Sequence, residues 1–148
     1  MTNLDDMAAL AATEQGLFVV STLRADGSIQ ASLVNAGVLP HPVTGQRVVG
    51  FVTYGRAKLA HLRARPKLTL TVRSGWDWAT VEGTAELVGP DDPHPAVDDD
   101  RLRLLLREVF SAAGGRHDDL AEYDRVMAEQ RRTVVLATPV RIYSNPPA

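Results

Sequence analysis

The sequence predicts a protein of the α+β class, mainly β with helices, built around a small six-stranded antiparallel barrel. Two observations support this prediction. The first three β-type segments are joined by connections too short for a parallel crossover. Apolar residues also occupy both alternating positions of the first segment, with Leu17 and Val19 on one side and Phe18 on the other. This pattern favours a closed barrel whose outside is covered by helices or by a second subunit. A monomeric sandwich is the alternative.

The first half of the chain is expected to form a helix at 4–15 and strands at 16–23, 29–39 and 46–54. The strand segments are rich in β-branched and aromatic residues, which favour extended structure. Asp26 and Gly27 lie between the first two strands and indicate a tight hairpin, because such turns require positive φ.

The second half is expected to form helices at 56–65, 101–114 and 118–130 and strands at 67–74, 76–88 and 131–143. Pro66 ends the first of these helices. The strand after it alternates apolar and polar residues, the period of a half-buried strand. Gly83 indicates a bulge or a close backbone approach within the long strand. The acidic run at 98–100 is expected to cap the helix that follows.

Composition excludes several classes of function. The 148 residues fit a single domain spanning 1–148, and the absence of cysteine excludes a disulfide framework and a thiolate site. A net charge of −2 argues against general nucleic-acid binding. No apolar stretch approaches the roughly 20 residues that span a bilayer, and the acidic start is unlike a secretory signal. We therefore expect a cytoplasmic protein with no nucleic-acid or membrane partner.

The sequence contains none of the common nucleotide-binding, zinc-protease or serine-hydrolase motifs. Its four histidines, His41, His61, His94 and His117, are scattered and are expected at the surface rather than as metal ligands. Carboxylate pairs fall in loops, and nothing places two of them across a cleft. We therefore predict no catalytic residue and no metal site, so an enzyme of this sequence would depend on a cofactor for its reactive atom.

Basic residues gather in one short segment, where six of the twelve residues from Arg56 to Lys67 are Arg, Lys or His. Arg56 and Lys58 stand at the start of a predicted helix, where free backbone N–H groups and the helix dipole attract anions. The residue types alone leave an anion site and a solvated helix face equally open. Arg131 and Arg132 form a second basic pair. This pair would contribute to an anion site only if the fold, or a partner subunit, placed it beside Arg56 and Lys58.

Four segments together carry a resemblance to a known family: STLRADGSIQAS, GRAKLAHLRARP, GWDWATVEGTAEL and EQRRTVV. They resemble the FMN-binding split β-barrel proteins related to pyridoxamine 5′-phosphate oxidase. Within that group, the chain is most similar to the actinobacterial branch of F420-dependent, deazaflavin-using reductases. The resemblance covers residues 5–147 and implies a homodimer with two cofactor sites at the subunit interface.

The resemblance also implies a cofactor site made of three groups of residues. Phosphate contacts are implied at the end of the third strand and the start of the helix: Thr53, Gly55, Arg56, Ala57 and Lys58. Ring contacts are implied on the second strand: Gln30, Ser32 and Asn35. Contacts from the partner chain are implied for Trp76, Trp78, Arg131 and Arg132. Core packing of a barrel strand is the alternative for the two tryptophans.

The implied activity is hydride transfer from C5 of reduced F420 to a conjugated, electron-poor small molecule such as a quinone, an enone or a tetrapyrrole-like acceptor. An FMN-dependent oxidase or reductase on the same barrel is one alternative. A non-catalytic protein that sequesters F420, flavin or haem is another. The sequence ends at VRIYSNPPA and lacks the longer C-terminal region of the true pyridoxamine phosphate oxidases, so oxidation of vitamin B6 is not expected.

Overall fold

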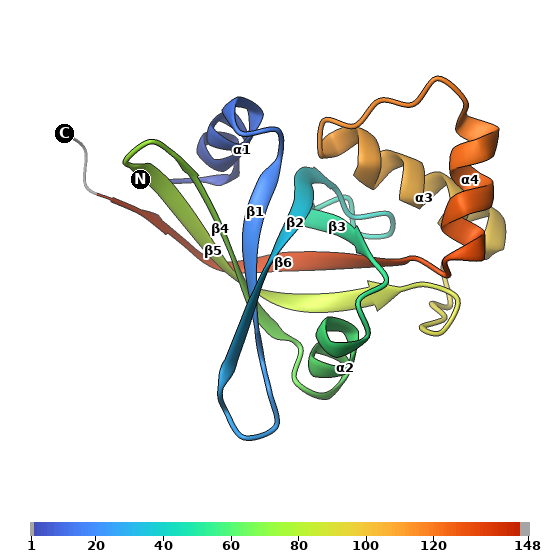
Figure 1. Cartoon of the computed structure of the whole chain (residues 1–148), viewed down its shortest axis with the longest axis horizontal. Helices are drawn as coiled ribbons and strands as arrows, with labels where there is room; N and C mark the ends of the chain where they lie inside the picture. Colours follow the sequence, from blue (N-terminus) through green and yellow to red (C-terminus); the bar gives the residue numbers. More distant parts are fainter. Residues whose placement is uncertain (1, 146–148) are drawn as a thin grey trace.

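The computed structural model describes residues 2–145, and within them six antiparallel strands close into one barrel in the order β1-β2-β3-β6-β5-β4 (Figure 1). The strands are β1 (Leu17–Leu23), β2 (Ile29–Pro40), β3 (Arg47–Thr53), β4 (Lys67–Ser74), β5 (Asp77–Val88) and β6 (Thr133–Ser144). The helices are α1 (Leu4–Thr13), α2 (Arg56–Ala64), α3 (Asp99–Ala112) and α4 (Leu120–Glu129). The predicted fold class is confirmed, and the last three residues of the expected sequence tail lie outside the described residues.

Local signals in the sequence explain most of the connections. Gly27 adopts a φ of 84° in the β1–β2 turn, and the carboxylate of Asp26 accepts the backbone N–H of Ser28 at 2.9 Å. The register between β5 and β6 shifts between Glu82 and Gly83, which is the expected bulge. A Cβ at Gly83 would lie 3.0 Å from a backbone carbonyl oxygen of β6. The turn and the bulge are therefore confirmed.

Four strands begin later than expected, β1 and β3 by one residue each, and the later starts of β5 and β6 have identifiable local causes. β5 starts at Asp77, because Gly75 turns the chain with a φ of 61° and leaves Trp76 in the turn. β6 starts at Thr133 rather than 131. The backbone N–H groups of Arg131 and Arg132 still donate to carbonyls at the end of α4, and Arg131 has a φ of 49°. The turn that ends α4 therefore occupies the first residues of the expected strand.

Apolar side chains from the strands fill the barrel, and two helices complete its interior. Phe18 of β1 and Phe51 of β3 are fully buried there, with Met7 of α1 and Leu62 of α2 in the same cluster. Figure 1 shows α1 and α2 on opposite sides of the barrel. Burial of these apolar faces is the main force that fixes both helices on the barrel.

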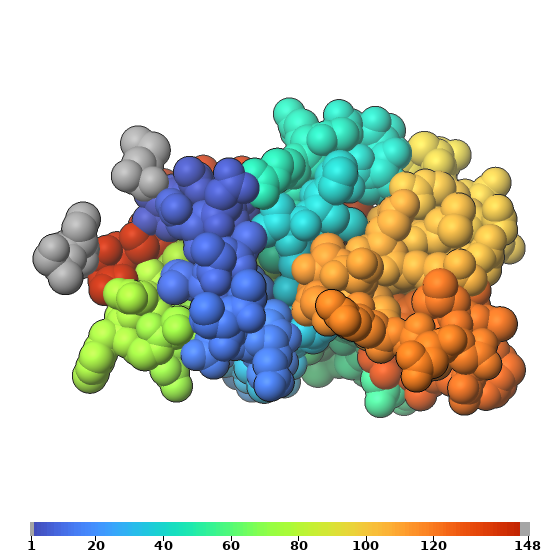
Figure 2. Space-filling view, turned by 90° about the horizontal axis from the view of Figure 1, so that it is seen from above, coloured from blue at the N-terminus to red at the C-terminus, as the bar shows by residue number. Residues whose placement is uncertain are grey.

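A second apolar cluster lies outside the barrel, where α3 and α4 cover β3 and β6. Val48 of β3 and Leu136 of β6 point outward and pack with Leu105 and Val109 of α3. Figure 2 shows α3 and α4 in orange at one end of the molecule and the β4–β5 hairpin in light green at the other. α3 also packs on the second half of β2, where Leu39 belongs to the same cluster. The outside of β1 and of the first half of β2 is different, because Val19 and Leu33 stay 44% and 61% exposed.

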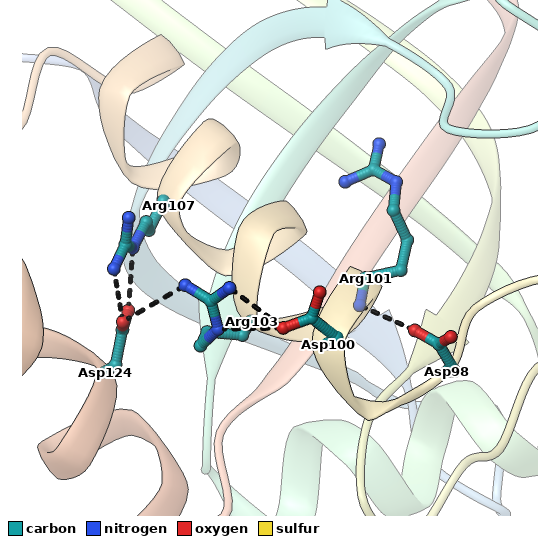
Figure 3. Close-up of polar contacts among 6 residues, drawn as sticks. All are labelled: Asp98, Asp100, Arg101, Arg103, Arg107 and Asp124. Atoms are coloured by element: carbon teal, nitrogen blue, oxygen red, sulfur yellow. Dashed lines mark hydrogen bonds and ion pairs between the residues drawn. The ribbon is translucent and has the colours of Figure 1, made fainter.

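Ion pairs join the two covering helices (Figure 3). The carboxylate of Asp124 on α4 accepts hydrogen bonds from Arg107 on α3 and lies 3.5 Å from the guanidinium of Arg103. The Asp98 carboxylate accepts the N–H of Arg101 at 2.7 Å, so the predicted acidic cap of α3 is confirmed. None of the helices within residues 2–145 is long and apolar enough to cross a membrane.

The expectation of four surface histidines is wrong for His41, which is only 7% exposed. Its Nε2 lies 3.0 Å from the carboxylate of Glu86, while its Nδ1 accepts the N–H groups of Val43 and Thr44. The hydrogen bonds fix the proton on Nε2 and satisfy the buried ring. His61 is also half-buried, and its Nδ1 lies 3.0 Å from the hydroxyl of Thr22.

Candidate anion-binding site

The start of α2 presents backbone donors that no side chain caps. Gly55 is its N-cap residue and has no side chain to accept a hydrogen bond. The Thr53 hydroxyl accepts the N–H of Gly55 at 3.1 Å, which fixes the backbone just before the helix. The first N–H groups of a helix lack intrahelical partners and carry the positive end of its dipole. This end of α2 can therefore bind an anion.

Strand pairing brings the second basic pair to the same place. Thr53 of β3 and Thr133 of β6 are register partners, so the residues beside them, Tyr54 and Arg132, are neighbours. The guanidinium carbon of Arg132 lies 3.8 Å from the centroid of the Tyr54 ring, within cation–π distance. Arg132 thus lies beside Tyr54, the residue that precedes the N-cap of α2, within one chain. The contact of Arg132 with the cofactor of a partner chain, which the resemblance implies, stays a prediction.

Ion pairing divides the basic residues of this region into two sets. Arg63 forms a bidentate pair with Asp92, and Arg131 pairs with Asp91 at 2.6 Å. In the described part of the chain, by contrast, no carboxylate lies within ion-pair distance of Arg56, Lys58 or Arg132. We call these three cations, with the uncapped start of α2, the anion corner.

Two cations of the anion corner are partly removed from water. Lys58 and Arg132 are half-buried, whereas Arg56 is exposed. Burial lowers the pKa of Lys58, and burial also lowers the pKa of Arg132, against an opposing effect of the Tyr54 and Tyr123 hydroxyls. Desolvated cations are unfavourable unless they are paired. An anionic ligand would supply the missing partner.

A buried acceptor without a donor lies on the second strand. The Gln30 Oε1 is buried and has no hydrogen-bond partner among residues 2–145. Gln30 is the register partner of Thr22, whose hydroxyl bonds to His61 of α2. Ser32 lies two residues further along the same face of β2 and is half-buried. Buried acceptors are rarely left unpaired, so this atom is available to an N–H group of a ligand.

Asn35 does not join Gln30 and Ser32. It is an exposed residue on the opposite face of β2, and its side-chain amide donates to the backbone carbonyls of Gln15 and Ala113. These bonds hold the end of α1 and the end of α3 against the strand. The side chain of Asn35 therefore has a structural partner of its own.

The two tryptophans lie away from the anion corner of the same chain. Trp76 is 93% exposed at the tip of the β4–β5 hairpin, so core packing is excluded for it. Trp78 is half-buried and meets the ring of Tyr143 edge-on, with centroids 6.1 Å apart. In Figure 1 this hairpin and α2 lie on opposite sides of the barrel. A contribution from either tryptophan to the site would require a second chain.

The structure adds two residues that were not predicted for the site, Tyr54 and His61. Tyr54 directly precedes Gly55, and only the pairing of β3 with β6 shows that it meets Arg132. His61 lies three residues after Lys58, so both are on the same side of α2. This spacing was visible in the sequence, whereas the partner of His61, Thr22, was not.

Together these features define a small β-barrel protein with a desolvated cationic corner at the end of its third strand. The chain belongs to the pyridoxamine 5′-phosphate oxidase family, whose model matches residues 4–144. Several solved structures share the fold. A conserved hypothetical protein from Mycobacterium tuberculosis superposes with a TM-score of 0.67 at 17% identity, over 97% of this chain and 84% of that one.

Two further structures carry a cofactor in their names. An F420 reductase matches with a TM-score of 0.56 at 17% identity, over 86% of this chain and 88% of that one. An FMN-binding protein related to pyridoxamine 5′-phosphate oxidase, from Nostoc punctiforme, matches with a TM-score of 0.61 at 13% identity, over 97% and 84% of the two chains. At these identities the likeness is one of fold.

Proposed function

We propose that the protein is an F420H2-dependent reductase that passes a hydride to a conjugated, electron-poor acceptor such as a quinone, an enone or a tetrapyrrole-like molecule. The observation that carries the proposal is the pair of half-buried cations, Lys58 and Arg132, that lack a carboxylate partner in the described residues. Such a pair beside an uncapped helix start suits the phosphate that F420 and FMN share. The similarity to an F420 reductase and the family resemblance of the sequence support the choice of F420.

The residues present fit such a cofactor. Lys58, Arg132 and the N–H groups of α2 would bind the phosphate, and the stacked ring of Tyr54 would hold Arg132 in place. The Gln30 Oε1 would accept an N–H group at the polar edge of the ring system, which satisfies that buried acceptor and orients the ring. When bound, reduced F420 supplies the hydride from its C5 position.

We further propose that two copies of the chain form a homodimer through the outside of the barrel. Leu33, Val19, Thr71, Thr80 and Tyr143 are successive register partners across five strands, and we call them the outer row. Its apolar members are exposed in the single chain. A second copy would cover this row and could bring its Trp76 toward the site, in agreement with the family resemblance.

A groove of about 430 Å³ beside the outer row offers space for the acceptor or the ring. Its walls include Leu23, Ile29 and Val140, with Lys67 and Glu82 at the rim. A largely apolar groove suits a planar conjugated molecule. A partner subunit over the outer row would close it and exclude water.

An FMN-dependent oxidase or reductase is the second candidate. The anion corner and the acceptor of Gln30 suit the phosphate and the ring edge of FMN as well. The similarity to an FMN-binding protein over 97% of the chain favours it.

A fluorescence titration with F420 beside FMN separates the candidates. We expect micromolar or tighter binding of F420 and much weaker binding of FMN, followed by oxidation of reduced F420 when a panel of quinones and enones is added. The reverse preference would favour the flavin candidate. Tight binding of F420 without turnover on any acceptor would favour a cofactor-sequestering protein.

A further inference from the structure

A cavity of about 390 Å³ lies between α3 and α4 and adjoins the anion corner through Arg132. Its apolar floor includes Leu102, Leu106 and Met127. Its polar wall includes three arginines and two aspartates: Arg103, Arg131, Arg132, Asp99 and Asp124. Because Arg132 belongs both to this wall and to the anion corner, a ligand whose phosphate occupies the corner could extend into the cavity.

The arginines of the wall differ in how firmly they are held. Arg103 lies between two carboxylates, with Asp100 at 2.9 Å and Asp124 at 3.5 Å, and the latter is only 16% exposed. Among residues 2–145, Arg131 has a single carboxylate partner, Asp91. The side chains of Arg131 and Asp91 are more than half exposed, at 59% and 58%.

An exposed ion pair contributes little net stability, because water and salt screen it. Replacing the Asp91 carboxylate by a ligand anion as the partner of Arg131 would therefore cost little free energy. The Asp124 pairs are more sheltered and also join α3 to α4, so their exchange would disturb the helices. Arg131 is thus the residue of the wall that a ligand can recruit.

We propose that the cavity between α3 and α4 receives a second anionic group of the ligand, with Arg131 as its contact and Asp91 as the internal competitor for that contact. The group is a carboxylate, as on the glutamyl tail of F420, or a second phosphate. A ligand with a second anionic group must displace Asp91 from Arg131 before it can use this contact. Asp91 therefore reduces the affinity that such a ligand gains over a ligand with the phosphate alone. This inference rests on the proposed function.

The test compares ligands that differ in the second anion, with binding followed by fluorescence. F420 is titrated beside F420 whose glutamyl residues have been removed, and FAD beside FMN. In Asp91→Asn we expect F420, FAD or both to bind about three- to tenfold more tightly, while trimmed F420 and FMN change less than twofold. In Arg131→Ala, F420 should bind no better than its trimmed form.

The double variant Asp91→Asn with Arg131→Ala isolates the coupling, since Asp91→Asn should have no effect once Arg131 is gone. Asp118→Asn, at an exposed carboxylate in the α3–α4 loop, controls for net charge. Equal tightening of all ligands, persistence of the effect without Arg131, or no change in Asp91→Asn would overturn the inference. Wild-type protein that binds neither F420 nor FMN would instead refute the proposed function.

Discussion

Tyr54 holds Arg132 by its ring face rather than by a hydrogen bond. The guanidinium of Arg132 lies over the ring at 3.8 Å, and its Nε donates to the side chain of Gln130 at 2.8 Å. These two contacts leave the guanidinium charge without a carboxylate and fix its direction. Tyr54 is therefore a positioning residue for the anion corner.

Tyr54→Leu should weaken binding of a phosphate-bearing cofactor by about 0.5–1 kcal/mol, roughly two- to fivefold, the range of an exposed cation–π contact. Tyr54→Phe should bind like wild type, because the ring face is retained. Fluorescence titration of both variants measures this. Equal loss in the two variants would show that the hydroxyl, rather than the ring, is what matters.

Lys58→Ala should weaken cofactor binding by about 1.5–3 kcal/mol, the range of a charge-assisted hydrogen bond, and leave the fold intact. Arg125→Ala removes one positive charge from the exposed side of α4 and serves as the matched control. Binding constants and circular dichroism are compared for both variants. Unchanged affinity in Lys58→Ala would contradict the phosphate contact.

The lowered pKa of Lys58 makes anion binding depend on pH in a definite direction. Only the protonated amine attracts a phosphate, and burial favours the neutral form. Affinity should therefore fall as pH rises, and the fall should begin below the ordinary lysine pKa of about 10.4. Titrations from pH 7 to pH 10 measure this, and Lys58→Arg should flatten the profile. A wild-type profile that is already flat would exclude Lys58 from the site.

The site residues that the sequence could indicate are those whose roles depend on local spacing. Arg56 and Lys58 follow from their place at the start of a helix. The period of two along a strand also separates Asn35 from Gln30 and Ser32, which the resemblance had grouped together. Tyr54 could not be found in this way, because its contact with Arg132 depends on the pairing of two strands that are far apart in the sequence.

At the level of elements, α3 and α4 meet around one buried tyrosine. The Tyr123 hydroxyl donates to the backbone carbonyl of Leu106 at 3.0 Å, and its ring stacks on Phe110 with centroids 4.7 Å apart. Burial raises the pKa of Tyr123 to about 12, so the phenol stays protonated and remains a donor. This contact fixes α4 on α3 and with it the start of β6.

Tyr123→Phe should lower the free energy of unfolding by about 0.5–1.5 kcal/mol, because one buried hydrogen bond is lost and the ring contact remains. Tyr123→Leu should cost more, since it also removes the stacking partner of Phe110. Urea denaturation of both variants provides the comparison. Equal costs would assign the stabilisation to the hydrogen bond alone, whereas no cost in Tyr123→Phe would assign it to the ring.

The order and type of the elements could be predicted because hairpin turns, Pro66 and the acidic cap at Asp98 are local signals. The start of β6 was misplaced for a physical reason. Arg131 adopts a left-handed conformation that a glycine would usually signal, and no glycine is present there. The sequence between α4 and β6 therefore contains no residue that marks a turn, and residues 131 and 132 were expected to belong to the strand.

At the level of the whole molecule, helices cover the outside of only part of the barrel. The sequence expectation that helices or a second subunit cover the barrel is confirmed for β3, β6 and the second half of β2, where α3 and α4 supply the cover. Val19 and Leu33 have no such cover within the described residues. The alternation of residues along a strand shows that both of its faces are apolar. It does not show whether a helix or a second subunit covers the outer face.

Leu33→Glu should convert the proposed homodimer into monomers, because it places a charge at the most exposed apolar position of the outer row. Val43→Glu changes an equally apolar, 54% exposed residue in the β2–β3 loop and should leave the assembly unchanged. Sedimentation velocity measures both. A dimer that persists in Leu33→Glu would exclude the outer row as the interface.

The closure of the barrel limits how the protein can associate. Each of the six strands has a neighbour on both sides, from the pairing of β1 with β4 around to that of β3 with β6. No strand is therefore unpaired along a whole side, and one-sided pairing is limited to parts of strands, such as residues 29–35 of β2 and 138–144 of β6. The ring thus confines β-augmentation, the route by which open sheets recruit peptides or nucleate fibrils, to these short segments. An assembly through the covered faces of the barrel forms through side chains, so single substitutions on the barrel surface can tune or abolish it without disturbing the backbone ladder.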